Sequence, residues 1–339
     1  LDIIKNNGHS NIDNNGNLFV SGTGVHALSS RIEYRNKFLF IELEPYFINQ
    51  KNSYLDSTIS GSYQYLNNHD SFSGSGRDDG LKNSQIILNF AAETHVDRAI
   101  NDAGIFINTD IYGTFILLEA ARSAENLKCF VQVSTDEVYG DVLKGRSDEK
   151  YPYKPSSPYS SSKASAELVF ASYFHSYFKK DFLSIASARA GNVIGGGDFK
   201  KDRIVPDVIK SLKNGRKILL RNPNATRPWQ HVLEPLSGYL ILGHKLMKKE
   251  LKSNLMPHWN FGPHKKNCKK VHSIVRLLIK EWGEKKQKIV FKRNKNFHES
   301  QLLSLNIEKA KKELLWKPRL TLNETVRFTV DWYKNYYKI

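Results

Sequence analysis

The sequence predicts an α/β protein with a doubly wound parallel sheet and a smaller C-terminal α/β region. Between residues 85 and 190, short apolar runs alternate with segments of helical apolar spacing, which is typical of βαβ units with parallel strands. After residue 195 glycine and proline become frequent and the alternation ends. We therefore expect a loose tail over 1–17, a sheet domain over 18–190 and a ligand-binding region over 191–339.

Compact apolar runs predict the strands of this sheet. These runs are 18–20, 38–41, 86–90, 130–133 and 182–188. Helices are predicted where apolar residues recur at helical spacing or where a long polar–apolar segment follows a turn. These segments are 105–124, 160–178 and 322–337. Residues 52–84 carry no clear signal, and 71–80 are expected to form a loop.

Composition favours a globular protein of the reducing cytoplasm. The chain has 339 residues, of which 40% are hydrophobic and 25% charged, as in an ordinary globular protein. No apolar run approaches the roughly 18 residues that a membrane-spanning helix needs, and the first residues do not resemble a signal peptide. The two cysteines, Cys129 and Cys268, predict neither a disulfide framework nor a metal site.

The formal net charge of +17 permits several partners. A basic chain can bind nucleic acid, an acidic membrane surface or an anionic small molecule. The lysines are spread over the C-terminal segments, and no zinc finger, basic zipper or arginine-rich arm is present. We therefore expect a solvated basic surface that favours an anionic substrate, and no nucleic-acid or membrane partner.

Tyr159 and Lys163 form the first candidate catalytic pair. A turn at 155–158 precedes them, and their four-residue spacing places both side chains on one helical face. A lysine ammonium beside a phenol favours the phenolate form, which lets a tyrosine act as a base near neutral pH. The pair also follows a Ser/Thr-rich strand end, as in short-chain hydride-transfer enzymes.

Asp136 and Glu137 form the second candidate pair. They lie in the segment 134–140, at the predicted carboxyl end of a strand, where ligands bind to open parallel sheets. Adjacent carboxylates raise each other's pKa. A protonated Asp136 beside an ionised Glu137 would supply the acid and the base that elimination of water requires. A solvated acidic turn is the alternative.

Three motifs together resemble the nucleotide-sugar 4,6-dehydratases of the extended short-chain dehydrogenase/reductase family. The motifs are residues 91–98, 134–140 and 159–163. The Thr135-Asp136-Glu137 triplet is the mark of the dehydratases, since related epimerases and decarboxylases generally lack the Asp-Glu pair. The resemblance covers residues 86–335. It implies a Rossmann-type NAD-binding domain over 18–190, a mainly nucleotide-sugar-binding region over 191–339, and a homodimer.

Further motifs resemble the CDP-glucose members of this family. They are residues 188–198, 202–206, 221–235, 259–263 and 329–333. The Asp136-Glu137 form is closer to the dTDP-glucose members, because CDP-glucose enzymes usually carry Asp-Lys there. CDP-glucose is the favoured substrate and dTDP-glucose the alternative. An epimerase or decarboxylase, and an inactive nucleotide-sugar binder, remain as other hypotheses.

The resemblance assigns roles to the candidate catalytic residues. Tyr159 would remove the proton of the sugar 4-hydroxyl while C4 gives a hydride to NAD. Thr135 would hydrogen-bond that oxygen, and Lys163 would orient the nicotinamide ribose. Glu137 would then remove the C5 proton while Asp136 protonates the departing 6-hydroxyl. Return of the hydride to C6 gives a 4-keto-6-deoxy sugar, an intermediate of deoxysugar and polysaccharide biosynthesis.

The remaining candidate residues bind ligands. For NAD they are Gly22, Gly24, Ala27, Glu42, Asp70, Ala91 and Ala92, with Glu44 as an alternative to Glu42. Gly22 to Ala27 departs from the glycine spacing that the family places at a helix N-terminus. For the nucleotide sugar they are His95, Asn192, Arg203 and Arg227, because guanidinium groups bind oxyanions in bidentate fashion. His95 and His231 lack a third metal ligand at useful spacing, so no metal is predicted.

Overall fold

The computed structural model describes residues 85–142, 145–178, 183–251, 257–284, 287–291 and 302–339, together with the backbone of four strands between residues 11 and 48. The chain divides into two compact units. The first comprises Leu1–Gln132 and Ser165–Ile185, and the second comprises Val133–Ala164 and Ala186–Ile339. This division differs from the predicted ranges 18–190 and 191–339, which stay a prediction about ligand-binding regions. No helix among the described residues is long and apolar enough to span a membrane.

The sheet of the first unit is parallel at one side and antiparallel at the other. Strand β5 (Ile86–Asn89) pairs in parallel with β6 (Cys129–Thr135), as predicted. Strand β3 (Val25–Arg35) runs antiparallel to β5 and to β4 (Phe38–Ile48). Strands β1 (Asn11–Ile12) and β2 (Leu18–Phe19) form a separate antiparallel pair.

The N-terminal region differs from a dinucleotide-binding βαβ unit. The predicted strands at 18–20 and 38–41 correspond to β2 and to the start of β4. A helix should follow the glycine turn in such a unit, but here β3 begins at Val25. The segment 25–35 contains several β-branched and aromatic residues, which suits an extended strand.

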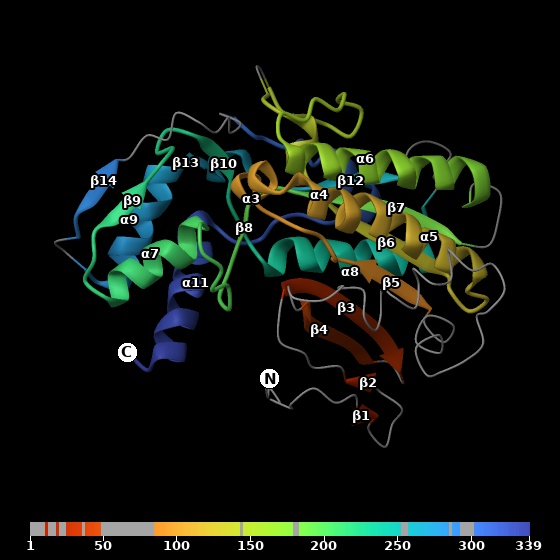
Figure 1. Ribbon diagram of the computed structural model, residues 1–339, viewed down its shortest axis with the longest axis horizontal. Coiled ribbons are helices and arrows are strands. Elements are labelled where there is room, and N and C mark those ends of the chain that lie inside the picture. Colours follow the sequence, from red (N-terminus) through yellow and green to blue (C-terminus); the bar gives the residue numbers. More distant parts are fainter. Residues whose placement is uncertain are drawn as a thin grey trace. The chain divides into compact units, whose positions relative to one another are not determined.

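The first unit carries one long helical stretch that changes its winding. It consists of α4 (Ala103–Phe106), the π-helical segment η1 (Ile107–Tyr112) and α5 (Gly113–Ser123), and it follows the short helix α3 (Val96–Asn101). A single helix was predicted at 105–124. The helix predicted at 160–178 is α6 (Pro158–Tyr173), extended by the π-helical segment η3 (Phe174–Phe178) (Figure 1).

A core of apolar side chains joins α5 to the second half of α6 and to the strands. Its members come from α5, β6, α6, η3 and the start of β7, and include Leu118, Phe130, Phe170, Phe174 and Ile185. Burial of such side chains contributes about 25 cal/mol per Å² of apolar surface. The core therefore fixes α6 at the residues that follow the Tyr159–Lys163 segment.

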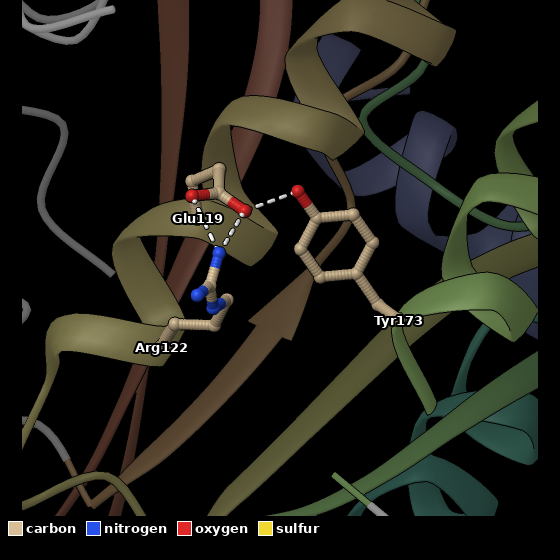
Figure 2. A network of polar contacts seen from close by, with 3 residues as sticks. All are labelled: Glu119, Arg122 and Tyr173. Atoms are coloured by element: carbon tan, nitrogen blue, oxygen red, sulfur yellow. Dashed lines mark hydrogen bonds and ion pairs between the residues drawn. The ribbon is translucent and has the colours of Figure 1, made fainter. Parts of the chain in front are cut away.

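Glu119, Arg122 and Tyr173 add a polar contact between the same two helices (Figure 2). The Tyr173 hydroxyl donates to Glu119, and Arg122 Nη1 lies 2.9 and 3.0 Å from the two Glu119 oxygens. Burial and the Glu119 carboxylate both raise the pKa of Tyr173. Arg122 also covers the ring of Tyr177 at 4.1 Å. Because Arg122 is half exposed, we expect its ion pair to add at most about 1 kcal/mol.

The second unit contains four short strand pairs and five helices among its described residues. The strand pairs are β7 (Ser184–Ala190) with β12 (His258–Phe261), β8 (Val193–Ile194) with β11 (Gln230–His231), β9 (Ile218–Leu220) with β14 (Ile289–Phe291), and β10 (Thr226–Pro228) with β13 (Cys268–Lys270). Only the last pair is antiparallel. The helices are α7 (Ile204–Lys213), α8 (Leu233–Met247), α9 (Val271–Trp282), α10 (Glu308–Leu314) and α11 (Leu322–Tyr337).

Helices α7, α9 and α11 enclose the second core (Figure 1). Each presents apolar side chains at helical spacing, among them Val208, Ile274, Val326 and Val330. Helix α11 has the bounds that the sequence predicts, because Thr321 and Glu324 form a capping box at its N-terminus. This core supports β9 and Trp229 next to the segments that carry the candidate substrate-binding residues.

Candidate active site

A tight turn after β6 carries the Asp-Glu pair. Strand β6 ends at Thr135, and η2 (Asp136–Tyr139) is one turn of 3₁₀-helix. The Thr135 hydroxyl accepts a hydrogen bond from the Glu137 amide at 3.2 Å. Gly140 closes the turn with φ of 65°, and a Cβ at this position would lie 2.1 Å from the Lys154 carbonyl oxygen. Only glycine therefore allows this close approach.

Asp136 lies in a buried position that favours its protonated form. The side chain is 3% exposed. Burial, together with the charge of Glu137, raises its pKa to about 8, although Arg227 and the Thr135 hydroxyl act in the opposite direction. Its Oδ2 atom has no hydrogen-bond partner among the described residues. Glu137 is only partly buried. The two neighbouring carboxyls are thus unlike, as a proton donor and a proton acceptor must be.

Tyr159 and Lys163 are placed by a capped helix start. Pro158 opens α6, a position at which proline loses no hydrogen bond. Ser157 and Ser160 cap it reciprocally: the Ser157 amide donates to Ser160 Oγ at 2.9 Å, and the Ser160 amide donates to Ser157 Oγ at 3.1 Å. The Lys163 ammonium is 4% exposed and donates to the Val133 carbonyl of β6 at 3.1 Å.

The structure brings Arg227 to the Asp-Glu turn. Arg227 is buried on β10, and its guanidinium lies close enough to Asp136 to oppose the rise in the pKa of that carboxyl. One of its nitrogens donates to the Thr226 carbonyl at 3.2 Å. A buried cation beside the acid suits an anionic ligand, since guanidinium donors match phosphate oxygens.

Asn192 and Arg203 occupy the loop and helix start that follow β7. The Asn192 carbonyl accepts from the Gln230 amide at 3.0 Å, while its buried Oδ1 atom lacks a partner in the part of the chain that the structure describes. Arg203 precedes α7 and lies 3.1 Å from Asp198, with side chains that are 37% and 32% exposed. Arg203 therefore already has a carboxylate partner, for which a phosphate would have to compete.

His231 has a structural contact. Its Nδ1 atom accepts from the Leu233 amide at 3.3 Å, and its ring packs edge-on against Phe328. Burial lowers the pKa of His231. The described residues contain no group of three potential metal ligands.

The first unit holds the loop that follows β5. The Ala91 amide donates to Asn89 Oδ1 at 3.0 Å, and the Glu93 amide donates to Asp110 Oδ1 at 2.8 Å. The buried Asp110 carboxylate serves here as an acceptor. His95 has an unusual φ of 108° directly before α3. The loop with Ala91 and Ala92 is thus held by side-chain acceptors on both sides.

Part of the predicted cofactor site lies outside the described residues. Gly22, Gly24 and Asp70 belong to that part. Ala27 lies in β3 and Glu42 in β4, and only the backbone is described there. The NAD-binding roles of these residues stay predictions.

Two side chains that the sequence did not indicate, one buried and one half-buried, also lie near Asp136. Tyr239 on α8 and Cys268 on β13 both interact with its charge. Burial raises the pKa of both groups, so neither ionises readily beside the acid. No local motif marks them, because only the tertiary fold brings them to the turn.

These features define an enzyme of the short-chain dehydrogenase/reductase class. A Tyr–Lys pair and a buried acid beside a second carboxylate lie at the carboxyl end of a parallel strand, all within the second unit. A family model described as GDP-mannose 4,6 dehydratase matches residues 81–329. The chain belongs to this family, the nucleotide-sugar 4,6-dehydratases of the extended short-chain dehydrogenase/reductase family, which are hydro-lyases.

Individual relatives agree with this assignment. The CDP-glucose 4,6-dehydratase of Salmonella typhimurium is 37% identical over 258 residues, which cover 74% of this chain and 70% of the relative. The dTDP-glucose 4,6-dehydratase of Bacillus anthracis, solved in complex with NAD, is 30% identical with a TM-score of 0.63 and covers 75% of this chain and 73% of that one. A UDP-glucuronic acid 4-epimerase of Bacillus cereus is 22% identical with a TM-score of 0.67, over 77% of this chain and 78% of that one. The fold is thus shared with an epimerase.

Proposed function

We propose that the protein is an NAD-dependent CDP-glucose 4,6-dehydratase that forms CDP-4-keto-6-deoxyglucose. The observation that carries the dehydratase reaction in this proposal is the unlike carboxyl pair after β6. Elimination of water needs a group that holds a proton at neutral pH next to one that does not. Asp136, with a pKa of about 8, and the more exposed Glu137 meet this requirement.

The described residues fit the nicotinamide–ribose end of NAD. The Lys163 ammonium has three N–H donors, of which one is used by the Val133 carbonyl, so donors are left for ribose hydroxyls. The next residue after Val133, Ser134, is buried, and its hydroxyl has no hydrogen-bond partner within the described ranges. NAD, when bound, supplies a reversible hydride acceptor for the sugar carbons.

Tyr159 and Thr135 serve the oxidation step in this proposal. The Tyr159 phenolate, stabilised by the Lys163 ammonium, removes the proton of the sugar 4-hydroxyl as C4 is oxidised. Thr135 donates a hydrogen bond to the same oxygen. A well-placed general base of this kind is worth about 10²–10⁴-fold in rate.

Asp136 and Glu137 serve the elimination step. The 4-ketone makes the neighbouring C5 hydrogen acidic, and Glu137 removes it as a proton. Asp136 gives its proton to the 6-hydroxyl, which leaves as water, and C6 is then reduced. The acid must be protonated before the step begins, which its buried position ensures at neutral pH.

The choice of CDP-glucose is supported by motifs on the substrate side. Residues 192–198 and 221–235 resemble CDP-glucose enzymes, and the Salmonella typhimurium relative acts on that nucleotide sugar by its description. In this proposal Asp136 and Glu137 lie at the reacting carbons of the sugar. Their identity therefore bears on how water is eliminated and not on which nucleotide base is bound. In this proposal His95 contacts the nucleotide sugar, and Arg227, Arg203 and Asn192 bind the diphosphate.

A panel of substrates tests the function. The purified protein is incubated with CDP-, dTDP-, UDP- and GDP-glucose, and products are followed by mass and by kcat/KM. We expect a product lighter by one water, with kcat/KM highest for CDP-glucose. A preference of tenfold or more for dTDP-glucose, about 1.4 kcal/mol, would overturn the nucleotide and leave the reaction class standing. A product of unchanged mass would indicate an epimerase.

We also propose that the enzyme is a homodimer of a reducing compartment such as the cytoplasm. The resemblance to the family suggests a homodimer through paired helices, and Ile107 on η1 and Leu168 on α6 are large apolar residues that are more than half exposed. Both cysteines are free thiols. Light scattering should give a dimer for the wild type and a monomer for Leu168→Glu; a wild-type monomer would contradict the dimer.

A further inference from the structure

A buried polar network lies behind the Asp-Glu turn and takes no part in the chemistry proposed above. Its centre is Tyr139, the last residue of η2, with Arg189 on β7 and Asn260 on β12 as neighbours. All three side chains are almost fully buried and belong to the second unit. Polar groups in such positions stabilise one arrangement only when their hydrogen bonds are satisfied.

The Tyr139 hydroxyl both accepts and donates. Arg189 Nη1 donates to it at 2.6 Å, and it donates to Asn260 Oδ1 at 2.9 Å. The second arm of Arg189, through Nη2, donates to the Tyr153 hydroxyl at 2.5 Å. The guanidinium also lies 5.0 Å from the centre of the Tyr139 ring. The phenol is thus held at its oxygen from two strands.

Asn260 has little freedom to turn. Its side-chain Nδ2 donates to the carbonyls of Ser147 and Asn306 at 3.1 and 3.2 Å, and its backbone amide donates to Glu149 Oε1 at 2.8 Å. Since the amide nitrogen has both of its donors engaged, Oδ1 points to Tyr139 in one orientation. Tyr139 is therefore held by Asn260, whose own orientation is set by its hydrogen bonds to the backbone.

We propose that Tyr139, held by Arg189 and Asn260, is a positioning residue that sets the Asp136–Glu137 pair for the elimination of water. This inference rests on the proposed dehydratase function. Asp136, Glu137 and Tyr139 share a single 3₁₀ turn of four residues, so a shift of Tyr139 moves both carboxyls. Tyr159 and Lys163 belong to α6, and Lys163 is anchored on Val133 instead. The network should therefore affect elimination more than oxidation, to which the turn contributes through Thr135 alone.

Tyr139→Phe tests this separation because it removes one oxygen atom and keeps the buried ring. The variant is given the nucleotide sugar that the wild type converts, in a single-turnover experiment. Reduced nicotinamide should accumulate, and release of dehydrated product should slow on the order of tenfold or more. This is the size of effect expected from a misplaced catalytic group. Substrate affinity measured by calorimetry should stay within about twofold of wild type, as a misplacement confined to the turn requires.

Tyr151→Phe is the matched control. Its ring packs edge-on against Tyr139 at 6.0 Å, outside the hydrogen-bond network, and the variant should behave as wild type. If Tyr139→Phe unfolds at a much lower temperature, Tyr153→Phe replaces it, because this change removes the outer acceptor of Arg189 and should slow elimination in the same direction. Elimination at the wild-type rate, or an equal loss of oxidation and elimination, would overturn the proposal. Failure of the wild type to dehydrate any nucleotide sugar would instead overturn the function.

Discussion

The turn after β6 and the loop after β7 are built in opposite ways. In the turn, Asp136 is buried, Gly140 packs on the Lys154 backbone, and Tyr139 is held by hydrogen bonds within the fold. In the loop at 192–203, Arg203 and Asp198 form a partly exposed ion pair. The turn is fixed before any ligand arrives, whereas the loop can exchange one anionic partner for another.

This difference separates the reaction from the recognition of the nucleotide. Groups that transfer protons gain from a fixed geometry and a low dielectric surrounding. Groups that hold a diphosphate can be exposed, since a charge-assisted hydrogen bond forms wherever the oxyanion reaches them. Changes in the turn should therefore alter kcat, and changes in the loop should alter KM.

The largest effect is expected for Tyr159→Phe. Without its phenol oxygen the protein lacks the base for the 4-hydroxyl, so turnover should fall by about 10²–10⁴-fold, while substrate affinity by calorimetry changes little. A variant that kept more than about a tenth of the wild-type rate would show that Tyr159 is not this base.

Glu137→Gln should separate the two halves of the reaction. The amide keeps the shape of the side chain but cannot accept the C5 proton. Bound NAD should still be reduced on addition of substrate, seen as nicotinamide absorbance, and dehydrated product should fall by about 10²-fold or more. Loss of the absorbance change together with the product would make Glu137 a binding or structural residue.

The pH dependence should show which carboxyl is the acid. Because the pKa of Asp136 is about 8, elimination should fall above this pH as the proton is lost, about tenfold per further unit in single-turnover measurements. Because the pKa of Asp136 is higher in the folded than in the unfolded protein, its protonated form adds to the free energy of unfolding below about pH 4. This contribution is lost as the pH rises to 8. Asp136→Asn should therefore lack elimination and gain unfolding free energy relative to wild type as the pH rises from about 4 to 8. The free energies of unfolding of the two proteins are measured by urea denaturation. A difference between them that does not change with pH would contradict a buried acid with a raised pKa.

Arg203→Ala should have the smallest effect. Its guanidinium is partly exposed and already paired with Asp198, so we expect KM to rise by about tenfold or less with kcat unchanged, the value of one charge-assisted hydrogen bond. Lys311→Ala, which breaks the exposed pair with Glu308, is the control and should leave both constants unchanged. A fall in kcat for Arg203→Ala would indicate that Arg203 contributes to catalysis, as the residues of the turn do, and not only to substrate binding.

The sequence predicted the parts of the molecule that local signals determine. The bounds of α11 follow from its apolar spacing and from Thr321, and the Tyr159–Lys163 pair follows from the turn before α6. Helices α7, α8 and α9 were missed because glycine and proline around them obscured the pattern. The strand β3 lies where a helix was expected after the glycine turn. Propensity is weak there, and pairing with β4 and β5 determines the conformation.

Part of the chemistry of the site could also be predicted, because it depends on residues that are neighbours in the sequence. Asp136 and Glu137 are neighbours in sequence, so their interaction needs no tertiary structure. The electrostatic interaction of Asp136 with Tyr239 and the hydrogen bond of Tyr139 with Arg189 join residues far apart in the chain. No rule of sequence spacing predicts such pairs, because they depend on which strands and helices the fold places side by side.

The fate of the hydrogen at C4 distinguishes the proposed reaction from its alternatives. CDP-glucose that carries deuterium at C4 is converted by the wild-type protein, and the product is analysed by mass spectrometry and NMR. We expect a product lighter by one water in which the deuterium is retained and located at C6, since oxidation at C4, elimination and reduction at C6 use one bound NAD. A product of unchanged mass, or a dehydrated product without deuterium at C6, would contradict the proposed reaction.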